Sequence, residues 1–312
     1  MIKGRQQILE WESRWTMPAG VATLFGAVLL IASAFVIGSV SGDTDSALLR
    51  SAHEHASAVT LASVLEALGF VLLVAPLVFL FRAADGRSEQ MRSQLIGLVV
   101  AAPLFLAASG LLNATATNEA ADSFSSGGAK STLTPKEAAS ECGSDLKEKG
   151  AKEFGEEHEA AKGSTPQARC VAEKRSDDEA SNALSEASTR GIATGFGLAG
   201  RLGLAIALFY TCLNAMRVGL LSRFWGSLGM ALGVAALLLL VQFSLIFFIY
   251  LGLLLIGRIP GGRPPAWPAG RAVPWPTAGE KAAAALEPSE PTADDEPEPP
   301  PDGPRRKRKR RD

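Results

Sequence analysis

The feature that most constrains this chain is a run of 34 residues, 224–257, that contains no charged side chain. The hydrocarbon core of a bilayer is about 30 Å thick, and an apolar helix of about 20 residues crosses it. The run is therefore either one long, tilted span or two short ones. Four other runs have the same apolar character, and hydrophobic residues make up 47% of the chain. Because these residues are concentrated in blocks, the sequence indicates a multi-spanning membrane protein.

Polar stretches separate these runs and divide the 312 residues into five parts. The parts are an interfacial N-terminus (1–17), spans one to three (18–112), a polar loop (113–190), spans four to six (191–258) and a Pro-rich tail (259–312) that is acidic and then basic. Pro18 stands where the first turn of a helix tolerates proline, so we expect the first span to begin there. The predicted fold is all-α: a polytopic transmembrane helix bundle with a helical or partly disordered extracytoplasmic loop and a disordered C-terminal tail.

Lysine and arginine in short loops favour the cytoplasmic side of a membrane. The N-terminus and the loops after the second and fourth spans carry more of them than the loop after the first span. We therefore expect the N-terminus in the cytoplasm and the polar loop outside. Two spans within 224–257, of about 16 residues or roughly 24 Å each, would turn near Gln242 to Ser244 and return the C-terminus to the cytoplasm. These six spans are favoured, and a single tilted span, giving five, is the alternative.

Two charged side chains lie inside predicted spans, Glu66 in the second and Arg201 in the fourth. Such charges are costly in a membrane unless they are paired or hydrated. Each lies ten residues from the outer end of its span, which is about 15 Å by helix rise. The matching depth predicts that Glu66 and Arg201 form an intramembrane charge pair. A proton or ion pathway that uses both groups is one alternative, and two groups without contact are the other.

The polar loop has two signals for the start of a helix. Thr134 and Thr165 are each followed by a proline, and Glu137 adds an acid three residues after Thr134. We therefore expect two or three helices here, with partial disorder as the alternative.

Two of the three cysteines, Cys142 and Cys170, lie in this loop, whereas Cys212 lies in an apolar run. Outside the cytoplasm, Cys142 and Cys170 can form a disulfide. Such a bond would stabilise a loop that has too few large apolar residues to bury much of a core.

Small residues recur at alternate turns of the fourth span, and such stripes let helices pack closely. They are Gly191, Gly195, Ala199, Gly203 and Ala207. A stripe of this kind indicates helix packing within a bundle or a homo-oligomer, and it does not separate a transporter from a scaffold.

The tail ends in consecutive basic residues, which follow an acidic, Pro-rich segment. These residues are Arg305, Arg306, Lys307, Arg308, Lys309, Arg310 and Arg311. They are expected to bind anionic lipid, or an RNA through its phosphates. Trp267 and Trp275, in the first part of the tail, are expected at the level of the lipid head groups.

Recognisable catalytic machinery is absent from the sequence. It has no GxSxG turn, no CxxC pair and no GxGxxG after a strand. His53, Glu54 and His55 are potential metal ligands, but adjacent and alternate residues do not share a helix face, so no metal site is predicted. We expect no cofactor and no enzymatic activity.

Two segments resemble a family of uncharacterised bacterial multi-spanning membrane proteins. One runs from Asn214 through Arg217 and Arg223 to Gly226, and the other contains Pro260-Gly-Gly-Arg-Pro-Pro-Ala-Trp267 and Ala272-Val-Pro-Trp-Pro276. The resemblance covers about the last third of the membrane region and, more loosely, the first span. It implies six spans and a cytoplasmic tail, and it implies no activity.

From these features we expect a multi-pass protein of a bacterial plasma membrane with both termini in the cytoplasm. The leading hypothesis is a scaffold, assembly or sensing component that acts through its extracytoplasmic loop and basic tail. Its partners would then be the lipid bilayer and another membrane protein or a second copy of the chain. The alternative is a small transporter or channel that uses Glu66 and Arg201.

Overall fold

The computed structural model describes residues 5–149, 165–238, 241–259 and 262–275. Within these residues every regular element is a helix, as expected for an all-α protein. The chain divides into two units after Pro274. Everything below concerns the described residues of the first unit.

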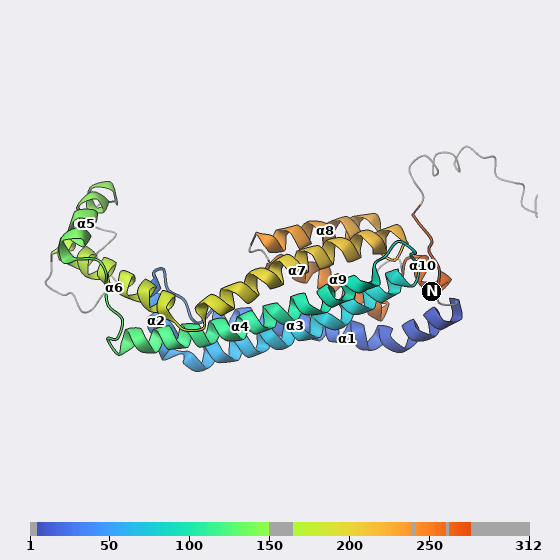
Figure 1. Ribbon diagram of the computed structural model, residues 1–312, viewed down its shortest axis with the longest axis horizontal. Coiled ribbons are helices and arrows are strands. Elements are labelled where there is room, and N and C mark those ends of the chain that lie inside the picture. Colours follow the sequence, from blue (N-terminus) through green and yellow to red (C-terminus); the bar gives the residue numbers. More distant parts are fainter. Residues whose placement is uncertain (1–4, 150–164, 239–240, 260–261, 276–312) are drawn as a thin grey trace, which may run out of the picture. The chain divides into compact units, whose positions relative to one another are not determined.

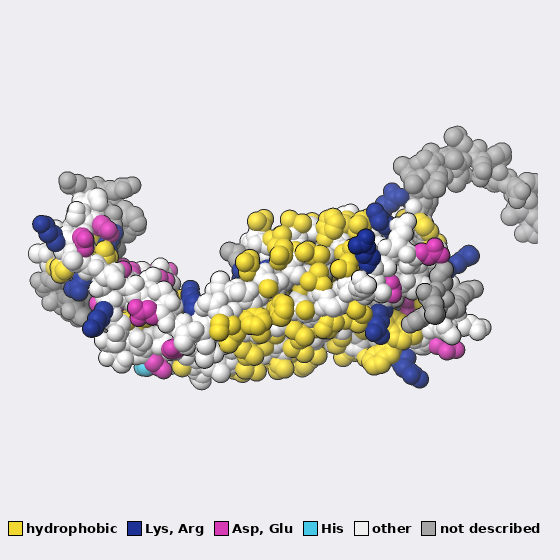
Figure 2. Space-filling model, viewed as in Figure 1, with side chains coloured by type: hydrophobic (Ala, Val, Ile, Leu, Met, Phe, Trp, Pro, Cys, Tyr) yellow, Lys and Arg dark blue, Asp and Glu magenta, His cyan; other side chains and the backbone are white. Residues whose placement is uncertain are grey.

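Four helices are long and apolar enough to cross a membrane. They are α1 (Arg5–Ile37), α3 (Ala56–Asp85), α4 (Ile96–Ser125) and α7 (Arg190–Arg217). Helix α3 packs between α1 and α4, and α4 packs against α7 (Figure 1). Hydrophobic side chains cover the middle of this bundle, and charged side chains gather beyond both ends of the apolar band (Figure 2). The four helices indicate a membrane location.

Two shorter apolar helices complete the bundle. They are α8 (Arg223–Leu237), which packs on α7, and α9 (Ser244–Ile256), which packs on α1. The chain reverses between them through the short 3-10 helix η3 (Val241–Phe243), close to the predicted turn. Their 15 and 13 residues span about 22 and 20 Å, which is less than the thickness of the hydrocarbon core.

The first helix begins earlier than the sequence predicts. Helix α1 starts at Arg5, and Pro18 lies inside it rather than in its first turn. Residues 5–17 are therefore the first turns of the first long helix and are continuous with the first span. Packing explains the continuation: Ile8 is buried, and the ring of Trp11 stacks on that of Phe79 in α3, with 5.0 Å between centroids.

The third long helix also extends beyond its predicted end at residue 112. Helix α4 continues to Ser125, and the added turns bury small side chains against α2 (Asp45–Glu54) and α6 (Pro166–Glu186). The resulting core is rich in alanine and includes Leu49, Ala116, Ala120 and Ala180. Hydropathy does not reveal this extension of α4 because alanine is only weakly apolar. The extension is nevertheless helical, since alanine has the highest helix propensity.

Helices α5 (Pro135–Lys149) and α6 pack on each other beyond this core. Both begin at the predicted capping residues. The Thr134 amide donates to the Glu137 carboxylate at 2.9 Å, and Thr165 Oγ1 accepts from the Ala168 amide at 3.3 Å. A disulfide joins Cys142 of α5 to Cys170 of α6. We call α2, α5, α6 and the end of α4 the cap, and the opposite end of the bundle the terminal end.

Asp178 of α6 organises the segment that leads into α5. Its carboxylate accepts from the amides of Thr132 at 2.6 Å and Leu133 at 3.1 Å, and from the hydroxyl of Ser131 at 2.8 Å. Desolvation acts to raise the pKa of Asp178, but these donors outweigh it and hold the pKa below its usual range.

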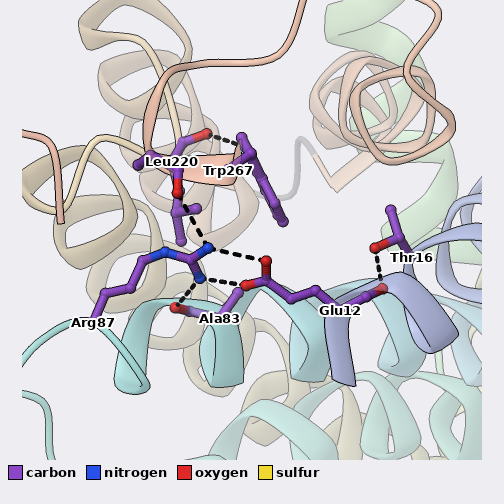
Figure 3. A network of polar contacts seen from close by, with 7 residues as sticks. Glu12, Thr16, Ala83, Arg87, Leu220 and Trp267 are labelled. Atoms are coloured by element: carbon purple, nitrogen blue, oxygen red, sulfur yellow. Dashed lines mark hydrogen bonds and ion pairs between the residues drawn. The ribbon is translucent and has the colours of Figure 1, made fainter. Parts of the chain in front are cut away.

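A buried ion pair closes the terminal end of the bundle (Figure 3). Arg87 follows α3, and its guanidinium donates to the carboxylate of Glu12 in α1, to the Ala83 carbonyl at 2.9 Å and to the Ala266 carbonyl at 3.2 Å. The side chains of Arg87 and Glu12 are only 0% and 6% exposed. We call Glu12, Arg87 and the segment around Ala266 the terminal clasp.

The clasp fixes the chain that follows α9 onto the bundle. Trp267, in the short helix α10 (Ala266–Ala269), is buried and donates from Nε1 to the Leu220 carbonyl at 3.0 Å. Its ring lies parallel to that of Phe79 and 5.8 Å from the Arg87 guanidinium. The prediction that Trp267 rests at the lipid head groups is therefore wrong, because its indole finds its partners inside the protein.

Candidate intramembrane binding site

A cavity of about 720 Å³ lies in the half of the apolar band nearer the cap. Its walls come from α1, α3, α4 and α7, and its floor comes from η3 and the start of α9. The lining includes Ser33, Phe35, Glu66, Ser109, Asn113, Leu198, Arg201, Gln242 and Phe248.

The cavity exists because α9 is short. Helix α9 packs on α1 and contacts α3 more weakly, but it begins only at Ser244. The glycine pair Gly20 and Gly252 shows where α9 and α1 meet: a Cβ on Gly20 would lie 3.2 Å from the Gly252 carbonyl oxygen. Nearer the cap, α1 and α7 continue without α9, and the space beside them is the cavity.

Glu66 reaches the cavity from α3. Its carboxylate lies beside Gly110 of α4, where an added Cβ would be 3.3 Å from Oε2. Leu61 is the first exposed large apolar residue of α3 at the cap end, so Glu66 lies about five residues, or roughly 8 Å, inside the apolar band.

Arg201 reaches the same cavity from α7. It lies nine residues beyond Ile192, the first exposed large apolar residue of that helix, or roughly 14 Å inside the band. Among the residues that the structure describes, no ion pair within 4.0 Å joins Glu66 to Arg201. The two groups therefore line the same cavity from different helices and form no ion pair with each other.

Two hydroxyl groups of the lining hold the helices together. Ser33 donates to the Ala62 carbonyl at 2.8 Å, and Ser109 donates to the Ala193 carbonyl at 2.8 Å. These bonds tie α1 to α3 and α4 to α7, which sets the distance between the walls. Glu66, Arg201, Asn113 and Gln242 remain as the polar side chains best suited to contact a ligand.

The cavity opens sideways between α1 and α7. On α1, Phe35 is 80% exposed, and on α7, Leu198 is 65% exposed, although both line the cavity. Exposed apolar side chains at this depth face the hydrocarbon region of a membrane. We call the gap between Phe35 and Leu198 the lateral opening.

The small residues of α7 that pack closely are not the predicted stripe. A Cβ on Gly200 would lie 2.9 Å from the Leu106 amide nitrogen of α4, and one on Gly203 would lie 2.9 Å from the Ala102 Cβ. A Cβ on Gly191 or Gly195 would meet nothing within 4 Å. Only Gly203 and Ala207, which is buried, belong to both the stripe and the packed face.

The other predicted site residues that the structure describes lie away from the cavity. Cys142 and Cys170 are bonded in the cap. His53 Nδ1 lies 3.1 Å from Asp122, and no group of metal-ligating side chains was found in the described ranges. The basic residues 305–311 lie outside the described residues.

The terminal clasp is not predicted from the sequence. Glu12 and Arg87 are 75 residues apart, and each stands near the end of an apolar run, where charged residues are ordinary. A signal was present in Glu12, an acid on the helix face that also carries Ile8.

Comparisons of the chain with models of protein families, with curated proteins and with solved structures found no match. The class that the fold and the site define is a helical membrane bundle with a charged cavity in its apolar band.

Proposed function

We propose that this chain is a non-enzymatic membrane protein that binds a small charged or polar molecule in the cavity, as a transporter or receptor does. The observation that carries the proposal is that Glu66 of α3 and Arg201 of α7 line the same cavity without an ion pair between them. Ionisable groups inside a membrane bundle mark ligand or ion pathways when they face a cavity.

The terminal clasp is the contrasting case within the same molecule. Arg87 and Glu12 are in direct contact, with further hydrogen bonds from Arg87 to carbonyl groups, and neither of them lines the cavity. In that arrangement each charge has the other as its partner. Glu66 and Arg201 lack each other as direct partners, and this favours a ligand that interacts with both.

Chemical labelling of one introduced cysteine tests the proposal. The native thiols do not interfere, because Cys142 and Cys170 are bonded and Cys212 is buried. Gln242→Cys places a thiol in the cavity, and Phe243→Cys places one at the next residue, which is 54% exposed and does not line the cavity. Both variants are reconstituted in lipid nanodiscs and treated with a cationic or an anionic thiosulfonate reagent.

We expect Gln242→Cys to react with both reagents and Phe243→Cys to react with neither. Adding Glu66→Gln should slow the cationic reagent by about tenfold, and adding Arg201→Gln should slow the anionic reagent similarly, because each charge concentrates its counter-ion locally. Equal and slow reaction at the two positions would disprove an accessible cavity.

A scaffold or sensing role through the cap is the second candidate. It is supported by the disulfide between α5 and α6 and by the hydrogen bonds around Asp178, which fix the cap's shape. Capture of a partner that is lost when residues 126–188 are deleted, and retained when the cavity charges are neutralised, would favour this role. Binding of anionic lipid or RNA by the basic tail remains a proposal, as does homo-oligomerisation.

We also propose the finer topology expected from the sequence. In it, α8 and α9 are the fifth and sixth crossings, both termini are cytoplasmic, and the membrane is a bacterial plasma membrane. The antiparallel arrangement of α8 and α9 supports six crossings. The resemblance of residues 214–226 and 260–276 to a family of multi-spanning membrane proteins implies the same topology and belongs to this proposal. A protease added from outside should cleave the cap and spare a tag at the C-terminus.

A further inference from the structure

We propose that the ligand of the cavity is a phospholipid of the surrounding bilayer whose head group carries both an ammonium and a phosphate group. This inference rests on the proposed function and names its ligand class. Two independent observations carry it. One is the lateral opening, and the other is that two opposite charges line the cavity without an ion pair between them.

The lateral opening determines how a ligand arrives. The gap between Phe35 and Leu198 lies within the apolar band, so a molecule in the hydrocarbon layer can pass its polar end inward while its acyl chains stay in the bilayer. A purely water-soluble ligand has no need for an apolar opening. The cavity volume, about 720 Å³, lies in the usual range for small-molecule sites, about 300–1,000 Å³.

The depth of the charges fits a lipid of the leaflet at the cap side. Glu66 and Arg201 lie about 8 and 14 Å inside the band by helix rise, and η3 and the start of α9 line the cavity beside them. A lipid from that leaflet therefore has to sink its head group only part of the way into the band.

The two side chains complement a zwitterionic head group. A guanidinium binds a phosphate through two parallel N–H donors, so Arg201 takes the phosphate. A carboxylate accepts hydrogen bonds from the three N–H donors of an ammonium group, so Glu66 takes the ammonium. The amides of Asn113 and Gln242 add donors for ester or phosphate oxygens.

This chemistry makes the site selective among common head groups. The trimethylated ammonium of phosphatidylcholine has no N–H to donate to Glu66. The glycerol head group of phosphatidylglycerol has no cation at all, so Glu66 would face an anionic lipid. Phosphatidylethanolamine should therefore bind more tightly than phosphatidylcholine or phosphatidylglycerol.

Native mass spectrometry of the full chain, with the three lipids carrying identical acyl chains, measures this selectivity. We expect phosphatidylethanolamine to bind about tenfold more tightly than either competitor. Glu66→Gln should reduce the preference for phosphatidylethanolamine over phosphatidylglycerol to less than about twofold. Arg201→Gln should weaken the binding of all three lipids by at least about tenfold, because it removes the charge-assisted hydrogen bonds to the phosphate. The exposed terminal-end variants Glu89→Gln and Arg92→Gln serve as controls and should change nothing.

A second pair of variants tests the lateral route. Ala34 of α1 is exposed and lines the cavity, whereas Val28 of the same helix is exposed and does not. Ala34→Trp should obstruct the opening and slow or abolish lipid binding. The Val28→Trp variant should bind phosphatidylethanolamine as the unmodified chain does.

The outcomes separate the inference from the proposed function. Equal binding of the three lipids, or selectivity unaffected by Glu66→Gln, would overturn the lipid inference. The lipid inference would also be overturned if soluble glycerophosphoethanolamine bound as tightly as the lipid and its binding were unaffected by Ala34→Trp. In that case the cavity would still bind a ligand, and the proposed function would stand. The proposed function itself is lost only if the thiol at residue 242 is also unreactive.

Discussion

At the scale of single residues, this chain contains charged groups of two kinds in its apolar helices. Arg87 and Glu12 pair with each other inside the protein, and Arg87 also donates to two carbonyl groups (Figure 3). Glu66 and Arg201 instead face a cavity. The first kind stabilises the fold, and the second kind is available for a ligand.

Removal of Arg87 should destabilise the whole bundle. Arg87→Ala leaves the Glu12 carboxylate buried without its cation, and breaking a buried pair in this way costs about 3–5 kcal/mol. The free energy of unfolding, measured by denaturant titration in mixed micelles, gives the value. Arg92→Ala, at an exposed position nearby, should cost less than about 0.5 kcal/mol. A loss at Arg87 as small as that at Arg92 would refute a stabilising clasp.

The cap should loosen at acid pH through Asp178. Because hydrogen bonds lower the pKa of its carboxyl in the folded cap, the unfolded cap binds this proton more readily. Its stabilising effect is therefore present above the ordinary aspartate pKa of about 4 and is lost as the pH falls through the lower, folded value. Amide protection at Thr132 and Leu133, measured by hydrogen exchange, should fall as the pH is lowered below about 4.

Asp178→Asn supplies the control for the titration. This variant should have weak protection at Thr132 and Leu133 already at pH 7, with little further change in acid. If the variant and the unmodified chain lose protection over the same pH range, another group controls the cap.

At the scale of elements, the contact between α4 and α7 depends on which glycines face the neighbour. The sequence predicts a stripe with the spacing of alternate turns, but the packed face contains Gly197, Gly200 and Gly203. Spacing defines several stripes on one helix, and only the position of the neighbouring helix selects among them.

Two matched substitutions distinguish these faces. Gly200→Ala brings a Cβ to 2.9 Å from the Leu106 amide nitrogen, and the backbone must move, which should cost about 1–3 kcal/mol. Gly195→Ala meets nothing within 4 Å and gains helix propensity, so it should be neutral or stabilising by up to about 1 kcal/mol. Thermal unfolding of the two variants side by side checks this, and the opposite order would mean that α7 is rotated.

At the scale of the whole molecule, the sequence alone predicted an all-α membrane bundle, the helix starts after Thr134 and Thr165, and a reversal near Gln242. Those features depend on local composition and local hydrogen bonds. The continuation of α4 past residue 112 was missed because its alanine-rich face is recognisable only beside α2 and α6. The terminal clasp and the cavity join residues far apart in the chain, so their geometry depends on how helices pack.

The measurement that tests the central claim most directly is the free energy of unfolding of Arg201→Ala beside that of Arg87→Ala. If Arg201 faces a cavity for a ligand, its removal should change the stability of the ligand-free protein by less than about 1 kcal/mol, because ligand-binding charges are often neutral or costly for stability. A loss of about 3–5 kcal/mol, equal to that expected for Arg87, would identify a structural ion pair with Glu66. That result would contradict the account.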